Sequence, residues 1–326
     1  MMIEAKKLVK IYNGNIKAVD GIDLSIEKGE IYGFLGPNGA GKTTTVKMLT
    51  TLLKPTSGYA SINGLDVVKE QEKVRKIIGL VPQDLSVDDD LKGIENLELQ
   101  ASFYGIGKEE ARKKAKELLE LVDLYHARDR YVSTYSGGMR KRLDLVSGLI
   151  HEPEVLFLDE PTLGLDVQTR TKMWEYIENL RKNLGITIFI TTHYLEEADR
   201  LCDRIGIIDK GRIMVEGRPE ELKNSVGFDL IYILSERPEE IKKYLDNAIN
   251  IEILEDGTIR FSVHNSEEYI PLLLQKIYQA GIKIKRLSIQ KPSLDTVFLK
   301  YTGREMREDE SREDIIRTMR AIRRAR

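Results

Sequence analysis

Apolar and polar positions alternate along residues 1–35, which is the pattern of β-strands that bury one face. Glycine-containing turns divide this segment. The run LSIEKGEIYGFLG predicts two strands, the second of which ends in a glycine-rich turn. A helix is expected from about Lys42 to Leu53, because Pro55 and Gly58 follow and would end it. The hairpin-like stretch GYASINGLDV and a short buried strand, IIGLVPQ, come next.

The pattern changes at Gly93 and changes back at Pro153. Between these two residues the chain is almost entirely helical in spacing. One clean apolar stripe is formed by Ala111, Ala115, Leu118, Leu119 and Val122. After Pro153, the predicted strands VLFLDE and GITIFITT alternate with helices at 167–184 and 194–202, and RIGIIDKGRIMVEG adds two strands. Such alternation predicts a mostly parallel sheet. The helical block, about residues 84–152, is therefore expected to be an insertion into an α/β core.

A new unit begins after Gly227. Its pattern predicts the order strand, helix, strand, strand, helix, strand, which is the ferredoxin-like α+β order. These elements are expected at 228–234, 238–246, 249–254, 258–263, 267–280 and 283–290. The predicted organisation is thus an α/β domain, a C-terminal domain and a charged helical tail, at residues 1–226, 227–303 and 304–326.

Composition limits the possible functions. The 326 residues carry a formal net charge of −2, so we expect no nucleic-acid partner. The single cysteine, Cys202, has no partner for an intrachain disulfide, which suits a reducing compartment. The sequence has no apolar run long enough to cross a bilayer and no signal-peptide pattern. We expect a cytoplasmic chain that serves a membrane through a partner.

The stretch GPNGAGKTT fits the phosphate-loop motif G-x-x-x-x-G-K-[ST] completely and lies between a predicted strand and a predicted helix. Glycines allow backbone N–H groups to surround phosphates. Lys42 would reach the β- and γ-phosphates, and the Thr43 hydroxyl would bind Mg²⁺. An ordinary glycine-rich turn is the alternative. The expected nucleotide-binding residues here are Gly36, Pro37, Asn38, Gly39, Ala40, Gly41, Lys42, Thr43 and Thr44.

A pair of acids, Asp159 and Glu160, follows the buried strand VLFL. Open α/β sheets bind ligands at the carboxyl ends of their strands. Asp159 is expected to hold Mg²⁺ through water, and Glu160 is the candidate to polarise the attacking water. Alone, such a pair would be read as a solvated strand end. Its occurrence after a complete phosphate loop favours the catalytic interpretation.

Two more polar residues end predicted strands. Gln83 ends IIGLVPQ, and its amide could contact Mg²⁺ or the water. His193 ends GITIFITTH and could donate a hydrogen bond to the γ-phosphate. We expect the other three histidines, His126, His151 and His264, to be exposed to solvent.

The stretch TYSGGMRKRLDL adds a second, incomplete phosphate-binding element. Ser136 is a plausible N-cap of the helix that follows, and a helix N-terminus can bind an anion. No lysine of the phosphate-loop kind accompanies Gly137 and Gly138.

These motifs together resemble the nucleotide-binding subunit of ABC transporters. The resemblance covers about residues 1–225 and rests on residues 36–44, Gln83, YSGGM, LFLDEP, GLD and His193, in the family's order. It implies an ABC cassette with a RecA-like core, an antiparallel β subdomain and a helical insertion. It also implies that Tyr12 stacks on adenine, whereas alone Tyr12 would be read as a half-buried strand residue. Two positions depart from the family's usual pattern, Tyr135 and Met139.

The resemblance explains the incomplete element. In the family, two chains pair head to tail and sandwich two ATP molecules, so that each SGG loop meets the other chain's phosphate loop. Ser136, Gly137 and Gly138 would then bind the γ-phosphate across the interface, with Asp166 at the same seam. The implied partners are a second ATP-binding subunit, expected to be identical, and transmembrane permease subunits that attach the chain to the cell membrane.

The stretch PSLDTVFLKYTGR resembles the end of the accessory domain of daunorubicin-resistance exporters, which implies export. The expected function is that of an ATP-hydrolysing motor that uses ATP and Mg²⁺. Two alternatives are a soluble ABC ATPase that acts on ribosomes or DNA and a small-molecule kinase. The SGG loop and His193 disfavour the kinase.

Overall fold

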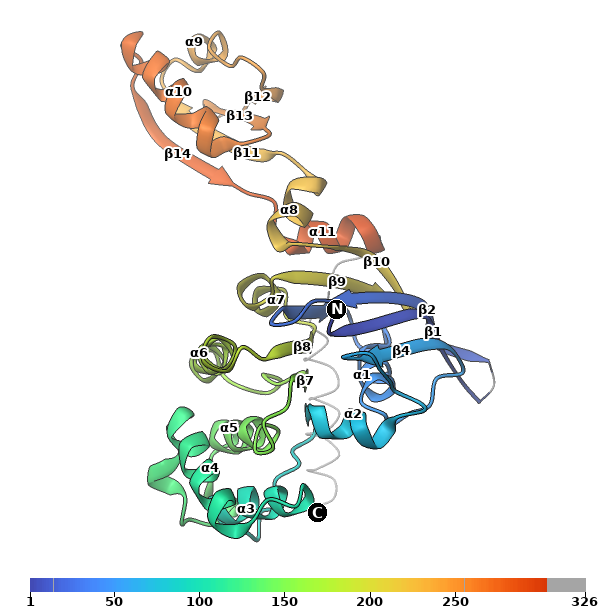
Figure 1. Ribbon diagram of the computed structural model, residues 1–326. Coiled ribbons are helices and arrows are strands. Elements are labelled where there is room, and N and C mark those ends of the chain that lie inside the picture. The colour runs from blue at the N-terminus through green and yellow to red at the C-terminus, as the bar shows by residue number, and fades with distance from the viewer. Residues whose placement is uncertain (14, 255, 304–326) are drawn as a thin grey trace, which may run out of the picture. The chain divides into compact units, whose positions relative to one another are not determined.

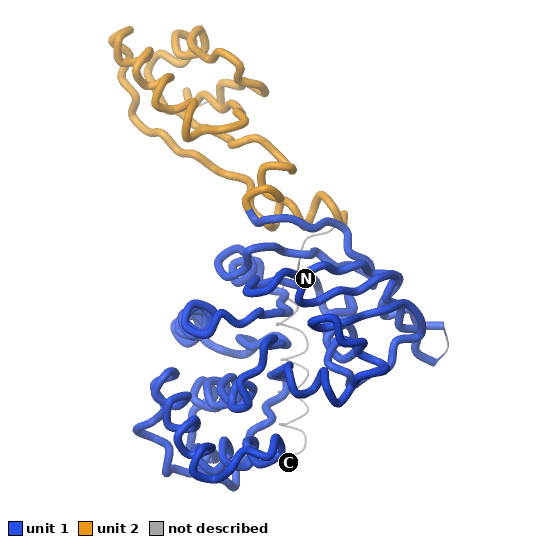
Figure 2. The backbone as a smooth tube through the Cα atoms, in the orientation of Figure 1, with its two compact units in different colours: residues 1–219, 306–326 blue, residues 220–305 orange. Residues whose placement is uncertain are grey.

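The computed structural model describes residues 1–13, 15–254 and 256–303. The chain divides into two compact units, one containing Met1–Pro219 and the other beginning at Glu220 (Figure 2). This division falls after the first residue of the short helix α8 (Pro219–Val226), whereas the predicted domain boundary follows the last residue of the helix. The boundary at residue 226 stays a prediction. The predicted helical tail, 304–326, lies outside the described residues.

The described residues of the first unit form two sheets. An antiparallel sheet has the order β2-β1-β4-β5, and a six-stranded sheet has the order β10-β9-β3-β8-β7-β6, parallel except at β10. The strands are β1 (Ile3–Tyr12), β2 (Ile16–Ile26), β3 (Ile31–Leu35), β4 (Ser57–Ile62), β5 (Leu65–Asp66), β6 (Ile78–Val81), β7 (Val155–Asp159), β8 (Thr187–Thr192), β9 (Arg204–Asp209) and β10 (Arg212–Gly217). The predicted mostly parallel sheet is confirmed.

The helix after the phosphate loop, α1 (Lys42–Leu49), contacts both sheets through β2, β4 and β7. It begins where predicted and ends four residues early. Thr50 is its C-cap, and Thr51 adopts a positive φ of 66° that stops further helical turns. The core around α1 includes Phe34, Phe157 and Phe189, whose rings pack on one another across three strands.

The helical insertion is present as a separate group of helices at one end of the first unit, beside β7 and α6 (Figure 1). It consists of α3 (Gly93–Phe103), α4 (Lys108–Leu121) and α5 (Gly137–Ser147), with short 3₁₀ turns between α4 and α5. The predicted stripe on α4 is largely correct, because Ala111, Ala115 and Leu119 are its buried residues. Residues 1–219, where the structure describes them, also form the helices α2 (Gln71–Ile77), α6 (Val167–Leu184) and α7 (Leu195–Leu201).

The sequence pattern misses one helix of this unit and misjudges the exposure of one histidine. The pattern did not predict α2, which buries only Val74 and therefore has no apolar stripe. His151 is half-buried rather than exposed. Its ring stacks on Tyr104 with centroids 3.7 Å apart, and its Nε2 lies 2.8 Å from the carbonyl oxygen of Ile78. Burial lowers the pKa of His151.

The second unit has the predicted ferredoxin-like order. Its antiparallel sheet, β12-β13-β11-β14, is flanked by α9 and α10, and α11 follows β14. Its core joins Ile231 and Phe261 of the sheet to Leu273 and Ile277 of α10. The bounds are β11 (Asp229–Ser235), α9 (Pro238–Lys242), β12 (Ile249–Ile253), β13 (Thr258–Val263), α10 (Ser266–Gln279), β14 (Ile284–Gln290) and α11 (Leu294–Thr302).

None of the helices in the part of the chain described here combines the length and apolar character required to span a bilayer.

Candidate functional site

The phosphate loop connects β3 to α1, as the motif requires. Two glycines are needed for close backbone approach. A Cβ on Gly36 would lie 2.3 Å from the carbonyl oxygen of Ile208, and one on Gly41 would lie 2.4 Å from that of Ala18. Gly41 also has a φ of 110°, which is unfavourable for other residues. The loop therefore packs tightly against neighbouring strands while the N-terminus of α1 stays free to bind phosphate.

The side chain of Lys42 folds back over this loop and is almost fully buried. Its Nζ donates to the carbonyl oxygens of Gly36 at 2.6 Å and Pro37 at 3.2 Å. The same Nζ lies 3.0 Å from Oε1 of Glu160. The structure thus brings the predicted phosphate-binding lysine into contact with the predicted catalytic carboxylate.

Parallel strands place the acids beside Thr191. Asp159 and Thr191 are paired in the register of β7 and β8. The Thr191 hydroxyl donates to Asp159 at 2.5 Å and accepts the backbone N–H of Glu160 at 3.0 Å. Burial raises the pKa of Asp159, and hydrogen bonds from Thr191 and Thr43 oppose this only in part. The predicted metal ligands Asp159 and Thr43 are therefore neighbours.

Glu160 lies between two positive or hydrogen-bonding groups. His193 Nδ1 is 3.1 Å from Glu160 Oε2, on the side of the carboxylate opposite Lys42. Burial alone raises the pKa of Glu160, but the His193 hydrogen bond and the Lys42 charge outweigh it and lower the pKa to about 2. Glu160 also adopts a φ of 51°, an uncommon conformation for a non-glycine residue.

Other predicted residues occupy the edges of this cluster. The hydroxyl of Tyr12, an exposed residue at the end of β1, lies 3.4 Å from that of Thr44, beside the phosphate loop. Gln83 is exposed, two residues beyond the end of β6. In the described part of the chain, its backbone carbonyl oxygen accepts a hydrogen bond from Lys141 Nζ at 2.8 Å, and its side-chain amide makes no hydrogen bond. The expectation that Gln83 ends a strand was wrong, because Pro82 lacks the N–H that would continue the ladder.

Ser136 and Asp166 each cap a helix. Ser136 accepts the backbone N–H of Met139 at 3.3 Å at the start of α5, which confirms the predicted N-cap. Asp166 accepts the backbone N–H of Thr169 at 3.0 Å at the start of α6. A Cβ on Gly138 would lie 2.5 Å from Thr169 Cγ2, so the two helix N-termini are adjacent. Within the described chain, no hydrogen bond or ion pair joins Ser136 to Lys42, Asp159 or Glu160.

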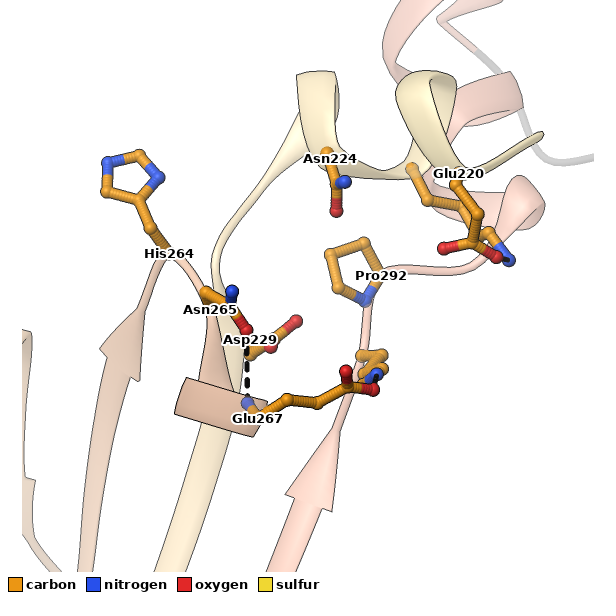
Figure 3. A pocket seen from close by; sticks show the side chains of 9 residues that line it. Glu220, Asn224, Asp229, His264, Asn265, Glu267 and Pro292 are labelled. Carbon is orange, nitrogen blue, oxygen red and sulfur yellow. Dashed lines mark hydrogen bonds and ion pairs between the residues drawn. The ribbon is translucent and has the colours of Figure 1, made fainter. Parts of the chain in front are cut away.

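A cavity of about 300 Å³ lies within the C-terminal unit (Figure 3). Its lysines are already paired, Lys223 with Glu220 at 2.6 Å and Lys291 with Glu267 at 2.5 Å. The buried Asp229 accepts the backbone N–H of Ser266 at 2.8 Å. None of the predicted nucleotide-site residues lines this cavity.

The loop, its lysine and the strand-end acids define a phosphate-loop nucleotide-binding protein. Residues 19–163 match the family described as ABC transporter, and residues 217–302 match the C-terminal domain of the DrrA1-3-like ATP-binding proteins. The daunorubicin/doxorubicin resistance ATP-binding protein DrrA of Streptomyces peucetius is 40% identical and covers 92% of each chain.

Two further proteins are similar to this chain over most of their own length. The Nod factor export ATP-binding protein I of Cupriavidus metallidurans is 37% identical, over 94% of this chain and 99% of its own. A solved dimeric ATP-binding cassette, in a post-hydrolysis state with ADP and Pi, aligns with a TM-score of 0.62 and 29% identity, over 67% of this chain and 98% of its own. The chain belongs to the ABC transporter ATP-binding proteins with a DrrA-like C-terminal domain, and it is the ATPase motor subunit of an ABC transporter.

We expect Thr191→Val, which replaces the hydroxyl by a methyl group of similar size, to damage the site. The hydroxyl serves the buried Asp159 carboxylate and the Glu160 amide, so its loss should lower the free energy of unfolding by about 1–3 kcal/mol. Displacement of the acids should lower ATPase kcat by about tenfold or more. Denaturant unfolding and steady-state kinetics measure both effects. Thr191→Ser, which keeps the hydroxyl, should behave like wild type; wild-type stability and kcat in Thr191→Val would contradict the assignment.

Proposed function

We propose that the chain binds ATP between Tyr12, which stacks on adenine, and the phosphate loop of residues 36–44. The observation that supports this most directly is the buried cluster of Lys42, Glu160 and His193 at the carboxyl edge of the parallel sheet. A lysine and a helix N-terminus supply the positive field that a triphosphate requires. Lys42 contacts the β- and γ-phosphates in this proposal.

The residues also fit Mg²⁺. Thr43 and Asp159 offer neighbouring hard oxygen ligands, and Mg²⁺ typically takes one or two carboxylates plus substrate phosphates. We propose these two residues as ligands, with Gln83 as a third group that approaches from its exposed loop. Bound there, Mg²⁺ would neutralise charge on the phosphates.

Glu160 is the proposed general base. In the structure its pKa is held at about 2, in part by the charge of Lys42, which makes it a weak base. The γ-phosphate competes with Glu160 for the same lysine. Transfer of Lys42 to phosphate removes one of the groups that lower the pKa of Glu160, so the carboxylate becomes a stronger base when substrate is bound. His193 would shift its hydrogen bond toward the γ-phosphate.

We further propose a head-to-tail dimer of identical chains. The N-termini of α5 and α6 are adjacent and carry Ser136, Gly138 and Asp166. Among the described residues, no hydrogen bond or ion pair connects these three residues to Lys42 or Glu160 of the same chain. Such termini are suited to the phosphate of an ATP held by another chain. The solved relative with ADP and Pi is dimeric, which supports pairing of two cassettes.

The motor would act on transmembrane permease subunits. A groove of about 640 Å³ between α3 and α4 is lined by Leu91, Leu99 and Ile106 together with the acids Glu95 and Glu98. Apolar and acidic groups together suit a permease segment with an apolar face and basic residues. The names of the relatives, which refer to drug resistance and export, support an exporter attached to the membrane through this contact.

The substitution Glu160→Gln tests the catalytic proposal. It should keep ATP binding and lower kcat by about 10² or more, because the base is lost while the phosphate ligands remain. Addition of ATP should then accumulate a stable dimer, measured by sedimentation velocity. Glu117→Gln, which changes an exposed residue of α4, is the matched control. Hydrolysis at near wild-type rate in Glu160→Gln would remove Glu160 from this role.

Mixed mutants test the composite site. A Lys42→Ala chain should not hold ATP, and a Ser136→Arg chain should not close over its partner's ATP. Their mixture retains one site with both halves intact, so we expect ATP-dependent pairing in the mixture and in neither mutant alone. Light scattering of the purified chains would measure it. Pairing of Ser136→Arg with itself would show that the SGG loop is no part of the interface.

The groove is tested by Leu99→Arg in cells that contain the permease partner. A charged side chain there should prevent docking, so we expect loss of recovery with membranes and unchanged ATPase activity of the isolated chain. Leu184→Arg, at an exposed leucine near the end of α6, is the control. Equal membrane recovery of both variants would argue that docking uses another surface.

A further inference from the structure

The loop that follows β6 is held by one face of α5. Asp144 of α5 is only 1% exposed, although aspartate is rarely buried. Its Oδ1 accepts the backbone N–H of Ser86 at 3.3 Å and also the hydroxyl of Ser86. Ser86 lies three residues after Gln83, so the buried carboxylate holds the loop near its centre.

Lys141 makes the second attachment, one helical turn before Asp144. Its Nζ donates to the backbone carbonyl oxygen of Gln83 at 2.8 Å. Residues three apart on a helix share a face, so Lys141 and Asp144 approach the loop from the same side. Arg140, on the same helix, adds an ion pair with Asp89 at 3.3 Å at the far end of the loop.

The hydrogen bonds between Asp144 and Ser86 should be strong because the Asp144 carboxylate is buried. A buried carboxylate is costly unless hydrogen bonds compensate its lost hydration. Burial raises the pKa of Asp144, and the hydrogen bonds from Ser86 oppose this. Its second oxygen, Oδ2, is buried with no hydrogen-bond partner among the described residues. Among the described residues, Ser86 therefore supplies both hydrogen-bond donors to this carboxylate, and loss of its hydroxyl would leave the buried carboxylate with the backbone N–H alone.

We propose that Lys141 and Asp144 form a clamp that fixes the loop Gln83–Ser86 to α5, and that they are positioning residues for ATP hydrolysis. The inference rests on the proposed roles of Gln83 at the phosphates and of Ser136–Gly138 at the partner's ATP. The helix α5 begins at Gly137, in the SGG loop that is proposed to face the partner's ATP. The clamp therefore connects that end of α5 to Gln83 through the hydrogen bonds of Lys141 and Asp144. A displacement of α5 on dimer closure therefore moves Gln83 with it.

The experiment uses the full chain with the substitutions Lys141→Met and Ser86→Ala. Lys141→Met keeps the apolar stem and removes the donor to Gln83; Ser86→Ala removes the hydroxyl donor to Asp144. Lys113→Met, at an exposed lysine of α4, is the matched control. Amide hydrogen exchange of the peptide covering residues 82–92 is measured without nucleotide, and ATPase kcat and KM are measured with it.

We expect exchange in this peptide to be about fivefold faster or more in both variants. We also expect kcat to fall by about tenfold while KM stays within about twofold, because positioning and not binding is lost. Combined with Gln83→Ala, Lys141→Met should lower kcat no further than Gln83→Ala alone. Lys113→Met should match wild type in every measurement.

Unchanged exchange in both variants would overturn the clamp, and so would additive losses of kcat in the double mutant. A Gln83→Ala chain with wild-type kcat would instead refute the role proposed for Gln83, and with it the route from the clamp to hydrolysis. Amide hydrogen exchange of residues 82–92 would still show separately whether Lys141 and Ser86 hold the loop Gln83–Ser86.

Discussion

A carboxylate buried between a lysine and a histidine is the constraint on which the site depends. Glu160 is almost fully buried, so its charge requires the compensation that Lys42 and His193 provide. These three groups come from three segments that are distant in sequence. They meet only because β3, β7 and β8 are parallel neighbours whose carboxyl ends share one edge. The tight glycines of the phosphate loop and the aromatic core beneath it keep that edge in place.

Much of the architecture could be predicted from the sequence because its signals are local. The phosphate loop, the buried strand before Asp159 and the alternation of strands and helices each lie within a short window. The ferredoxin-like order of the C-terminal unit follows from the same periodicity. Where the window contained no apolar stripe, as in α2 with its single buried Val74, the pattern failed.

The partners of the site residues could not be predicted because they depend on register and docking. Thr191 lies opposite Asp159 only in the register that β7 and β8 adopt, and a threonine in a buried strand carries no signal of its own. The same holds for Asp144, whose burial against Ser86 is decided by how α5 packs on the loop. His151 was expected to be exposed for the same reason, since its stacking partner, Tyr104, follows α3 and is distant in sequence.

The ion pair between Lys42 and Glu160 also bears on how such a site can change over generations. When a nucleotide phosphate binds Lys42, the ion pair between Lys42 and phosphate replaces the ion pair between Lys42 and Glu160. The net affinity for nucleotide is therefore a difference between two ion pairs. Substitutions that weaken the internal pair would then tighten nucleotide binding with no new contact to the ligand. Natural selection can therefore adjust the nucleotide concentration at which the motor works by changing residues around Glu160. The phosphate loop itself can stay unaltered.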